Sequence, residues 1–234
     1  MDEATVSAAS RGEQEAVVAV LAAVLPEVWR MSVNLSGGES AGREIARDVL
    51  RRGQVAMEGF ERPEQAKRWF RHHTILAVRT AKATKEADAL LNERDVPPAL
   101  RAAFRAHVAA LRKLPEQQRE AFLLRHGEGW DDRQLGIAMD CSVEAASVHF
   151  RRANESLAPL APDLWPQLVR VVGEAYRAND PPADVRVPLV RRWMSGRLRR
   201  RLTAAALFLG WAIVLAVAAC LAILAWWLWP RLDW

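Results

Sequence analysis

The sequence predicts an all-α protein, made of a helical bundle, a helix-turn-helix domain, a linker and a single C-terminal transmembrane helix. Three observations predict this class: apolar residues recur at helical spacing through most of the first 157 residues, no segment alternates as a strand does, and residues 204–229 carry no charge. The expected order is a disordered N-terminus at 1–12, a helical domain at 13–83, a linker at 84–99, the helix-turn-helix domain at 100–160, a linker and basic juxtamembrane segment at 161–202, the transmembrane helix at 203–229 and a short external tail at 230–234.

The apolar run at residues 203–229 is long enough to cross a bilayer. A helix rises ~1.5 Å per residue and a bilayer core is ~30 Å thick, so about 20 residues suffice. A buried core helix is the alternative, but such helices rarely run this long without a polar residue. The flanks carry charged and aromatic anchors, namely Arg199, Arg200 and Arg201 before the run and Trp226, Trp227 and Trp229 at its far end. Because arginines mark the cytoplasmic side, we expect a single-pass protein of the cell inner membrane whose N-terminal domains are cytoplasmic.

The rest of the chain is basic. The formal net charge of the protein is +5, and the apolar run contributes none of it, so the excess lies in the other domains and favours an anionic partner. The two cysteines, Cys141 and Cys220, stand in different settings and predict no disulfide framework. His72 and His73 are adjacent, so they point apart on a helix and form no metal pair. No metal or cofactor is expected.

Proline and glycine divide the N-terminal part into helices. The first 12 residues are small and polar, which predicts disorder. Three helices are expected after them, separated near Gly37 and Pro63 and ending close to residues 36, 57 and 82. Further on, residues 164–178 form an amphipathic pattern. That helix would lie either on the membrane or on the other domains, and the pattern does not separate these two positions.

A helix-turn-helix is expected at residues 114–157. Pro115 suits the first turn of a helix that Gly127 and Gly129 end. Asp131 or Asp132 can cap the next helix, in which Gly136 would allow a close helix crossing. Ser142 is a good cap for the last helix, which carries Ser147, His149, Arg151 and Arg152.

The polar and basic side chains of this last helix suit a DNA major groove. Arg151 and Arg152 can bind phosphates, and Ser147 or His149 can reach base edges. The alternative is a plain helical hairpin with solvated arginines, and periodicity alone does not exclude it.

The residue pattern of this segment resembles region four of bacterial sigma factors, especially the extracytoplasmic-function group. The residues that carry this resemblance are Leu114, Pro115, Gln118, Arg119, Phe122, Leu124, Arg125, Gly129, Leu135, Ser142, Arg152 and Ala153. Glycine is usual in that family where Asp140 stands, and aspartate tolerates the left-handed conformation that such a turn needs.

The N-terminal half resembles region two of the same family, in the family's order. Residues 25–37 look like its first helix, residues 43–50 like its polymerase-binding helix, and residues 60–71 like the segment that approaches melted promoter DNA. The resemblance therefore implies polymerase contacts through Glu44, Arg47, Asp48 and Arg51, and contacts to melted DNA through Lys67, Arg68, Trp69 and Arg71. Trp69 also has apolar neighbours, so a role in the core is the alternative to base stacking.

These patterns together predict a membrane-tethered sigma factor of the extracytoplasmic-function type. It would bind core RNA polymerase and promoter DNA, and it would be neither an enzyme nor a cofactor protein. An anti-sigma factor, a membrane partner or a protease are further candidate partners. The alternative is a membrane-bound helix-turn-helix regulator or signalling protein that has lost polymerase binding.

Overall fold

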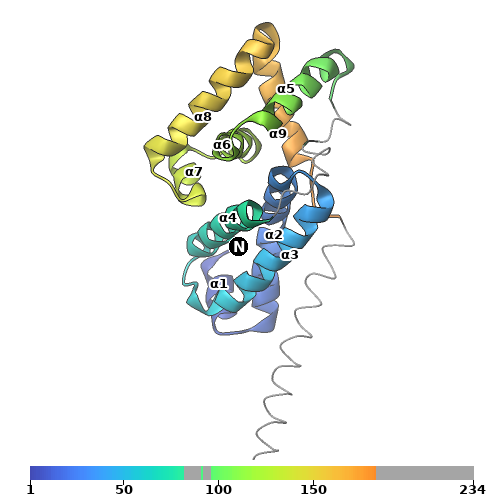
Figure 1. Cartoon of the computed structure of the whole chain (residues 1–234). Coiled ribbons are helices and arrows are strands. Elements are labelled where there is room, and N and C mark those ends of the chain that lie inside the picture. The colour runs from blue at the N-terminus through green and yellow to red at the C-terminus, as the bar shows by residue number, and fades with distance from the viewer. Residues whose placement is uncertain (82–90, 92–95, 183–234) are drawn as a thin grey trace, which may run out of the picture. The chain divides into compact units, whose positions relative to one another are not determined.

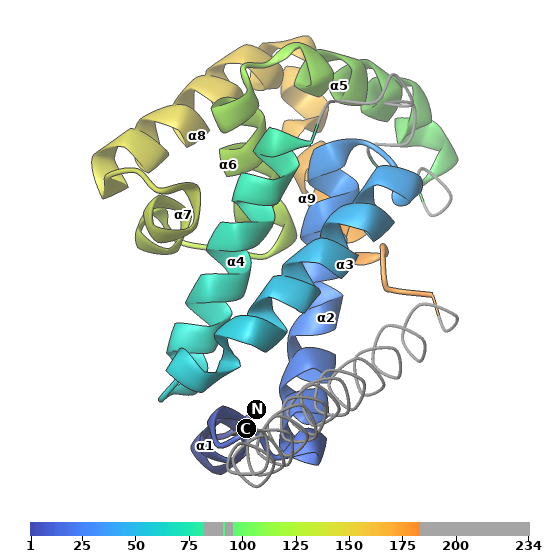
Figure 2. The same cartoon turned by 60° about the horizontal axis from the view of Figure 1, so that its bottom comes forward.

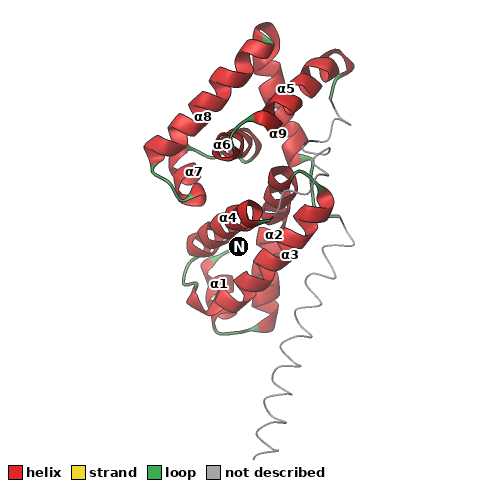
Figure 3. Cartoon of the chain, in the orientation of Figure 1, coloured by secondary structure: helices red, strands yellow, loops and turns green. Residues whose placement is uncertain are grey.

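The computed structural model describes residues 1–81, 91 and 96–182, and these form nine α-helices and no strand (Figures 1 and 3). The all-α prediction is therefore confirmed for this part of the chain. The predicted transmembrane helix at 203–229, its arginine and tryptophan anchors and the tail lie outside the described residues. Most of the predicted linker at 84–99 also lies outside them.

The first four helices form an N-terminal lobe around α2. They are α1 (Glu3–Ser10), α2 (Gln14–Ser36), α3 (Glu39–Ala56) and α4 (Pro63–Thr80). Helix α2 packs against the other three and buries Leu21, Val28 and Met31. Among the described helices, α2 alone has the length and hydropathy of a membrane span. Its apolar face is covered by protein, so it is the core helix of this lobe.

Helix α1 corrects the prediction of a disordered N-terminus. Its first turn is capped by the Asp2 carboxylate, which accepts a hydrogen bond from the Thr5 amide at 2.8 Å. Val6 and Ala9 are fully buried, and α1 packs on α2. A helix of this length is not stable alone in water. Its order comes from packing on α2, which local composition does not reveal.

The predicted breaks between the N-terminal helices are confirmed. Gly37 ends α2 with a φ of +84°, a conformation that glycine adopts without a steric penalty. Pro63 opens α4, where the side chain of Gln65 accepts hydrogen bonds from the amides of Glu61 and Arg62 at 2.8 and 3.1 Å. The chain therefore reverses direction at both positions, and this reversal places α3 and α4 beside α2.

The remaining helices form a C-terminal lobe (Figure 2). They are α5 (Arg101–Lys113), α6 (Glu116–Gly127), α7 (Asp132–Met139), α8 (Val143–Leu157) and α9 (Trp165–Arg177). Helix α9 corrects the predicted linker at 161–202 over its first part. It buries Leu168, Val171, Val172 and Tyr176 and packs mainly on α6. The amphipathic segment was expected to lie either on the membrane or on the other domains. In the structure it lies on the other helices of the protein.

The two lobes contact each other directly. Helix α4 packs against α7, and α2 meets both α6 and α9 (Figure 1). Glu120 of α6, which is only 1% exposed, receives two hydrogen bonds from the Arg79 guanidinium of α4 at 3.0 and 2.6 Å. Arg30 of α2 holds the Glu128 carboxylate in the same bidentate way, at 3.0 and 2.9 Å. Charged pairs thus join the lobes on two sides.

The packing of α3 on α4 predicts a sharp cost for one added methyl group. A Cβ on Gly53 would lie 2.2 Å from the Phe70 ring, whereas a Cβ on Gly59 would meet nothing within 4 Å. We expect Gly53→Ala to lower the free energy of unfolding by about 1–3 kcal/mol, because the buried ring cannot move away freely. Gly59→Ala should change it by less than about 0.5 kcal/mol. Urea unfolding followed by circular dichroism measures both, and equal stabilities would contradict this packing.

Candidate nucleic-acid interface

The helix-turn-helix is framed by capped helices. The Asp131 carboxylate accepts from the Gln134 amide at 2.7 Å, and the Gln134 side chain accepts from the Asp131 amide at 3.0 Å, so a capping box begins α7. The Ser142 hydroxyl accepts from the Ala145 amide at 3.1 Å and begins α8. Both predicted caps are therefore present. They set where the turn between α7 and α8 starts and ends.

The turn itself depends on Asp140 and Gly136. Asp140 has a φ of +57° and ends α7 in the left-handed conformation, as the sequence predicted. Gly136 was expected at a helix crossing, but the close neighbour is the turn: an added Cβ would lie 3.0 Å from the Cys141 carbonyl oxygen. The glycine therefore lets the backbone of the turn fold back on α7.

The outward face of α8 presents the predicted arginines to solvent. Arg151 and Arg152 are exposed, and Arg151 forms only a loose surface pair with Glu155 at 3.7 Å. Ser142 is exposed at the start of the helix, while Ser147 is half-buried. Ala146, Ala153 and Leu157 point inward and are buried. Two exposed guanidinium groups at adjacent positions of α8 suit binding to DNA phosphates.

His149 is placed differently from the arginines. It is half-buried, and its Nδ1 atom has no hydrogen-bond partner in the described residues. Burial, and then the charges of Arg152 and Arg79, lower its pKa. The ring is therefore neutral at pH 7. A neutral imidazole can accept or donate a hydrogen bond, so direct base contact remains chemically possible through its other nitrogen.

The inner face of α8 is supported by an aromatic and cationic cluster. The ring centroids of Phe150 and His126 lie 5.3 Å apart. The Cζ atom of Arg125 lies 5.2 Å from the centroid of the Phe150 ring. Burial, and then the charge of Arg125, lower the pKa of His126 to about 4. Phe122 contacts the same histidine at 4.7 Å. His126 thus packs between Phe122 and Phe150 as an aromatic ring of the lobe's core.

The residues predicted to meet melted DNA lie on α4 in unequal settings. Arg68 is exposed, and Lys67 is half-buried and paired with Glu64 at 2.9 Å. Arg71 donates to the Glu27 carboxylate at 2.8 Å and lies 4.7 Å above the Trp130 ring of the C-terminal lobe. Two of these cations are therefore engaged in protein contacts, and Arg71 is engaged across the boundary between lobes.

Trp69 lies at the edge of the N-terminal core. Its ring stacks on the His73 ring at 3.8 Å and meets Phe70 edge to face at 5.1 Å, yet it is only half-buried. Trp69 thus packs against the core as in the alternative reading, and stacking on a base stays a prediction. A groove of about 460 Å³ runs beside it, lined on one side by Phe60, Arg68, Trp69, His72 and His73 and on the other by Ile137 and Asp140 of the α7 segment. Helix α7 therefore forms one wall of this aromatic groove.

The predicted polymerase-binding residues share the open side of α3. Glu44, Arg47 and Arg51 are exposed and Asp48 is half-buried. Burial opposes ionisation of Asp48, but hydrogen bonds from Arg51 and Arg52 outweigh it and lower its pKa. The Asp48 carboxylate lies 2.7 and 2.6 Å from those two guanidinium groups. The result is an ordered charged surface that can face a partner.

The comparisons with known proteins identify the helix-turn-helix. Residues 104–157, from α5 to the end of α8, match the family model for region 4 of sigma-70. A search of the curated proteins found no match. The predicted region-4-like domain is therefore confirmed. A region 4 of sigma-70 implies binding to DNA and RNA polymerase.

The sequence missed the residues that join the lobes. Arg30, Arg79, Glu120 and Glu128 were not among the candidates, although they form two bidentate pairs. The one available signal was Glu120, a carboxylate that directly precedes the apolar run at 121–124 in a predicted helix. Its partner is 41 residues away on another helix, and no local pattern reports such a distance.

We predict that the two arginines of α8 contribute phosphate contacts. In full-length protein, Arg151→Ala with Arg152→Ala should weaken binding to every duplex alike and reduce the slope of log K against log salt by about two. Arg170→Ala is the matched control, because Arg170 on α9 is equally exposed and also paired with a glutamate four residues on. Fluorescence anisotropy over a range of salt concentrations measures the slope, and an unchanged slope in the double variant would sink this assignment.

The buried His126 predicts a loss of stability in mild acid. Its pKa is about 4 in the folded protein and 6.5 in the unfolded chain, so the unfolded state binds the proton first as pH falls. The free energy of unfolding is therefore unaffected by this group above pH 6.5 and falls as the pH drops towards 4. The total loss amounts to about 3 kcal/mol. His126→Phe should remove it. Urea unfolding at several pH values checks this prediction, and parallel curves for the two proteins would contradict it.

Proposed function

We propose that the chain is a membrane-tethered sigma factor of the extracytoplasmic-function type. It binds core RNA polymerase and directs recognition of promoter DNA. The match of residues 104–157 to region 4 of sigma-70 is the observation that carries the proposal. In the proposed mechanism, the protein makes and breaks no covalent bond. Its residues select a DNA site and position the polymerase there.

The C-terminal lobe would read the upstream promoter element. Arg151 and Arg152 are exposed on α8 and would bind phosphates, while Ser142 at its N-cap and Ser147 and His149 along the helix would reach base edges. The capped turn between α7 and α8 orients the helix for entry into a major groove. Phosphate contacts would set the register, and the polar side chains would supply the sequence preference.

The N-terminal lobe would bind polymerase and the melted strand. The charged side of α3 is ordered by its own ion pairs, so little side-chain entropy is lost when a partner binds it. Arg68 and the half-buried Trp69 beside the groove of α4 suit an unpaired base, because an aromatic ring stacks on bases of any sequence. These two surfaces come from consecutive helices of one bundle.

Reversing charges on α3 tests the polymerase contact. We expect Asp48→Arg with Arg51→Glu to weaken core polymerase binding by more than about tenfold, because like charges would then face the partner. Glu64→Lys with Lys67→Glu is the matched control, since this pair has the same spacing on α4. Pull-down of core polymerase by full-length protein gives the affinity, and circular dichroism checks the fold. Equal binding by both variants would contradict the assignment.

Run-off transcription with full-length protein and core polymerase tests the whole proposal. Initiation from a defined site that depends on the protein is the expected result. DNA binding without polymerase binding would instead favour the alternative, a helix-turn-helix regulator that has lost polymerase binding. Binding of neither would favour a signalling protein.

The membrane tether is proposed from residues 203–229 alone. Full-length protein should stay in the membrane pellet after alkaline extraction. Val214→Arg with Leu215→Arg should release it, because each arginine at the centre of a span costs about 2.5–3.5 kcal/mol on insertion. An N-terminal tag should be cleaved only after the cytoplasmic side is opened to protease. Wild-type protein found in the soluble fraction would exclude a permanent tether and favour release by a protease.

A further inference from the structure

Helix α9 follows the residues that match region 4 of sigma-70 and is anchored tightly to the C-terminal lobe. A Cβ on Gly173 would lie 2.5 Å from the His126 carbonyl oxygen, and a Cβ on Gly127 would lie 2.4 Å from the Tyr176 ring. The two helices therefore touch at both glycines. The Arg177 guanidinium also donates to the carbonyl oxygens of His126 and Gly127, at 3.1 Å each, and satisfies the C-terminal end of α6.

The C-terminal end of α9 is bound to the other lobe. The fully buried amide of Asn34, on α2, donates to the Tyr176 carbonyl oxygen at 3.2 Å. The Asn179 amide in turn donates to the Asn34 side-chain oxygen at 2.7 Å. The Asp180 carboxylate lies 3.8 Å from the Arg30 guanidinium. The last turn of α9 and the residues that directly follow it thus contact α2 three times.

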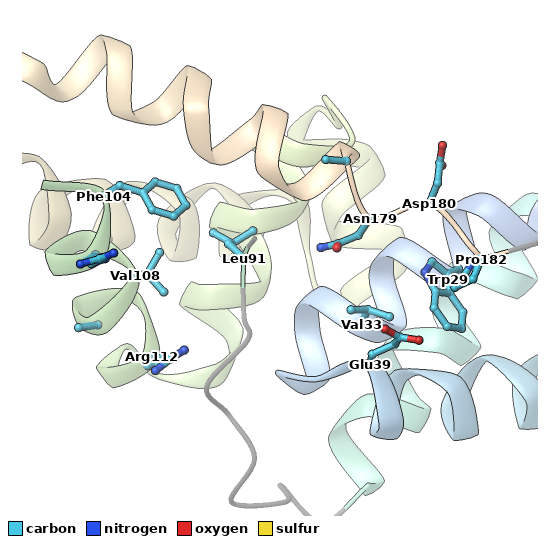
Figure 4. Close-up of a pocket in the computed structure, with 13 residues that line it drawn as sticks. Trp29, Val33, Glu39, Leu91, Phe104, Val108, Arg112, Asn179, Asp180 and Pro182 are labelled. Carbon is cyan, nitrogen blue, oxygen red and sulfur yellow. The ribbon is translucent and has the colours of Figure 1, made fainter. Parts of the chain in front are cut away.

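A cavity lies beside these contacts, between the two lobes. Between Trp29 and Val33 of α2 and Phe104 and Val108 of α5 lies a cavity of about 620 Å³ (Figure 4). Asn179 lies at its rim in the view of Figure 4. At the edge of this cavity, the residues that follow α9 link the C-terminal lobe to α2 through Asn179 and Asp180.

Residues of the C-terminal lobe cover one face of α4. The Arg71 guanidinium lies over Trp130, the His72 ring nitrogen Nδ1 is 3.3 Å from the Ala138 carbonyl oxygen, and Arg79 is bound to Glu120. All three partners belong to the C-terminal lobe. DNA cannot reach this face of α4 while the lobes are together.

We propose that α9 is an intramolecular latch that holds the two lobes closed and keeps this face of α4 covered. The inference rests on the proposed function, because it assigns that face to promoter DNA in the polymerase complex. In this proposal, core polymerase takes only the open form, in which the covered face of α4 is free to meet promoter DNA. The apparent affinity for polymerase is then the intrinsic affinity multiplied by the open fraction. Releasing α9 from α2 or α6 raises that fraction.

The test measures the distance between the lobes and the polymerase affinity in the same full-length proteins, held in detergent. Spin labels replace the exposed Val55 on α3 and Ser156 on α8, after Cys141 and Cys220 are changed to serine. Gly173→Leu should force α9 away from α6, lengthen and broaden the distance distribution, and tighten core polymerase binding up to about tenfold. Glu174→Ala is the control, because Glu174 is exposed on the next position of the same helix.

A milder variant guards against misfolding. Asn179→Ala with Asp180→Ala removes the contacts to Asn34 and Arg30 without changing a core residue, and it should shift the distances in the same direction by less. Unchanged distances in both variants would overturn the latch. Longer distances with unchanged polymerase affinity would overturn its inhibitory role. Longer distances in proteins that never bind polymerase would support the latch as a structural device and overturn the sigma-factor proposal instead.

Discussion

Two carboxylates in the C-terminal lobe are held by arginines of the N-terminal lobe, and the arrangement of the molecule depends on these pairs. Glu120 is 1% exposed, and burial raises its pKa more than the Arg79 guanidinium lowers it. The side chain of Glu128 is 8% exposed and is held by Arg30. Removing either arginine would leave a buried carboxylate unpaired, which is strongly destabilising, whereas the intact pair contributes little net stability. The two pairs thus determine how the lobes are positioned, but they contribute little net free energy to holding them together.

This constraint makes the two candidate DNA surfaces unequal. The outer face of α8 carries the exposed Arg151 and Arg152, while on α4 the Arg71 guanidinium is shared between Glu27 and Trp130. Of the two candidate surfaces, α8 is therefore the more open one in this structure, while the C-terminal lobe covers part of α4.

In the helix-turn-helix, most local features could be predicted from the sequence. Asp131 and Ser142 cap their helices as expected, and Asp140 takes the left-handed conformation in place of glycine. Each of these features depends on residues within four positions along the chain. The match of residues 104–157 to region 4 of sigma-70 agrees with that reading. Gly136 was read correctly as a point of close approach, but the approaching group is the backbone of the turn and not a second helix.

The sequence by itself determined the all-α class, most helix boundaries, the capped turn and the arginines of α8, because periodicity, caps and glycines act over a few residues. The order of α1, the docking of α9 and the partners of Arg71, Arg79 and Glu120 were decided only by the tertiary structure. Helix α1 is too short to be stable without α2. The sequence pattern of an amphipathic helix such as α9 does not indicate which surface packs against its apolar face. Arginine and glutamate are usually solvated in a helix. Only the fold brought residues 41 and 98 positions apart within hydrogen-bonding distance.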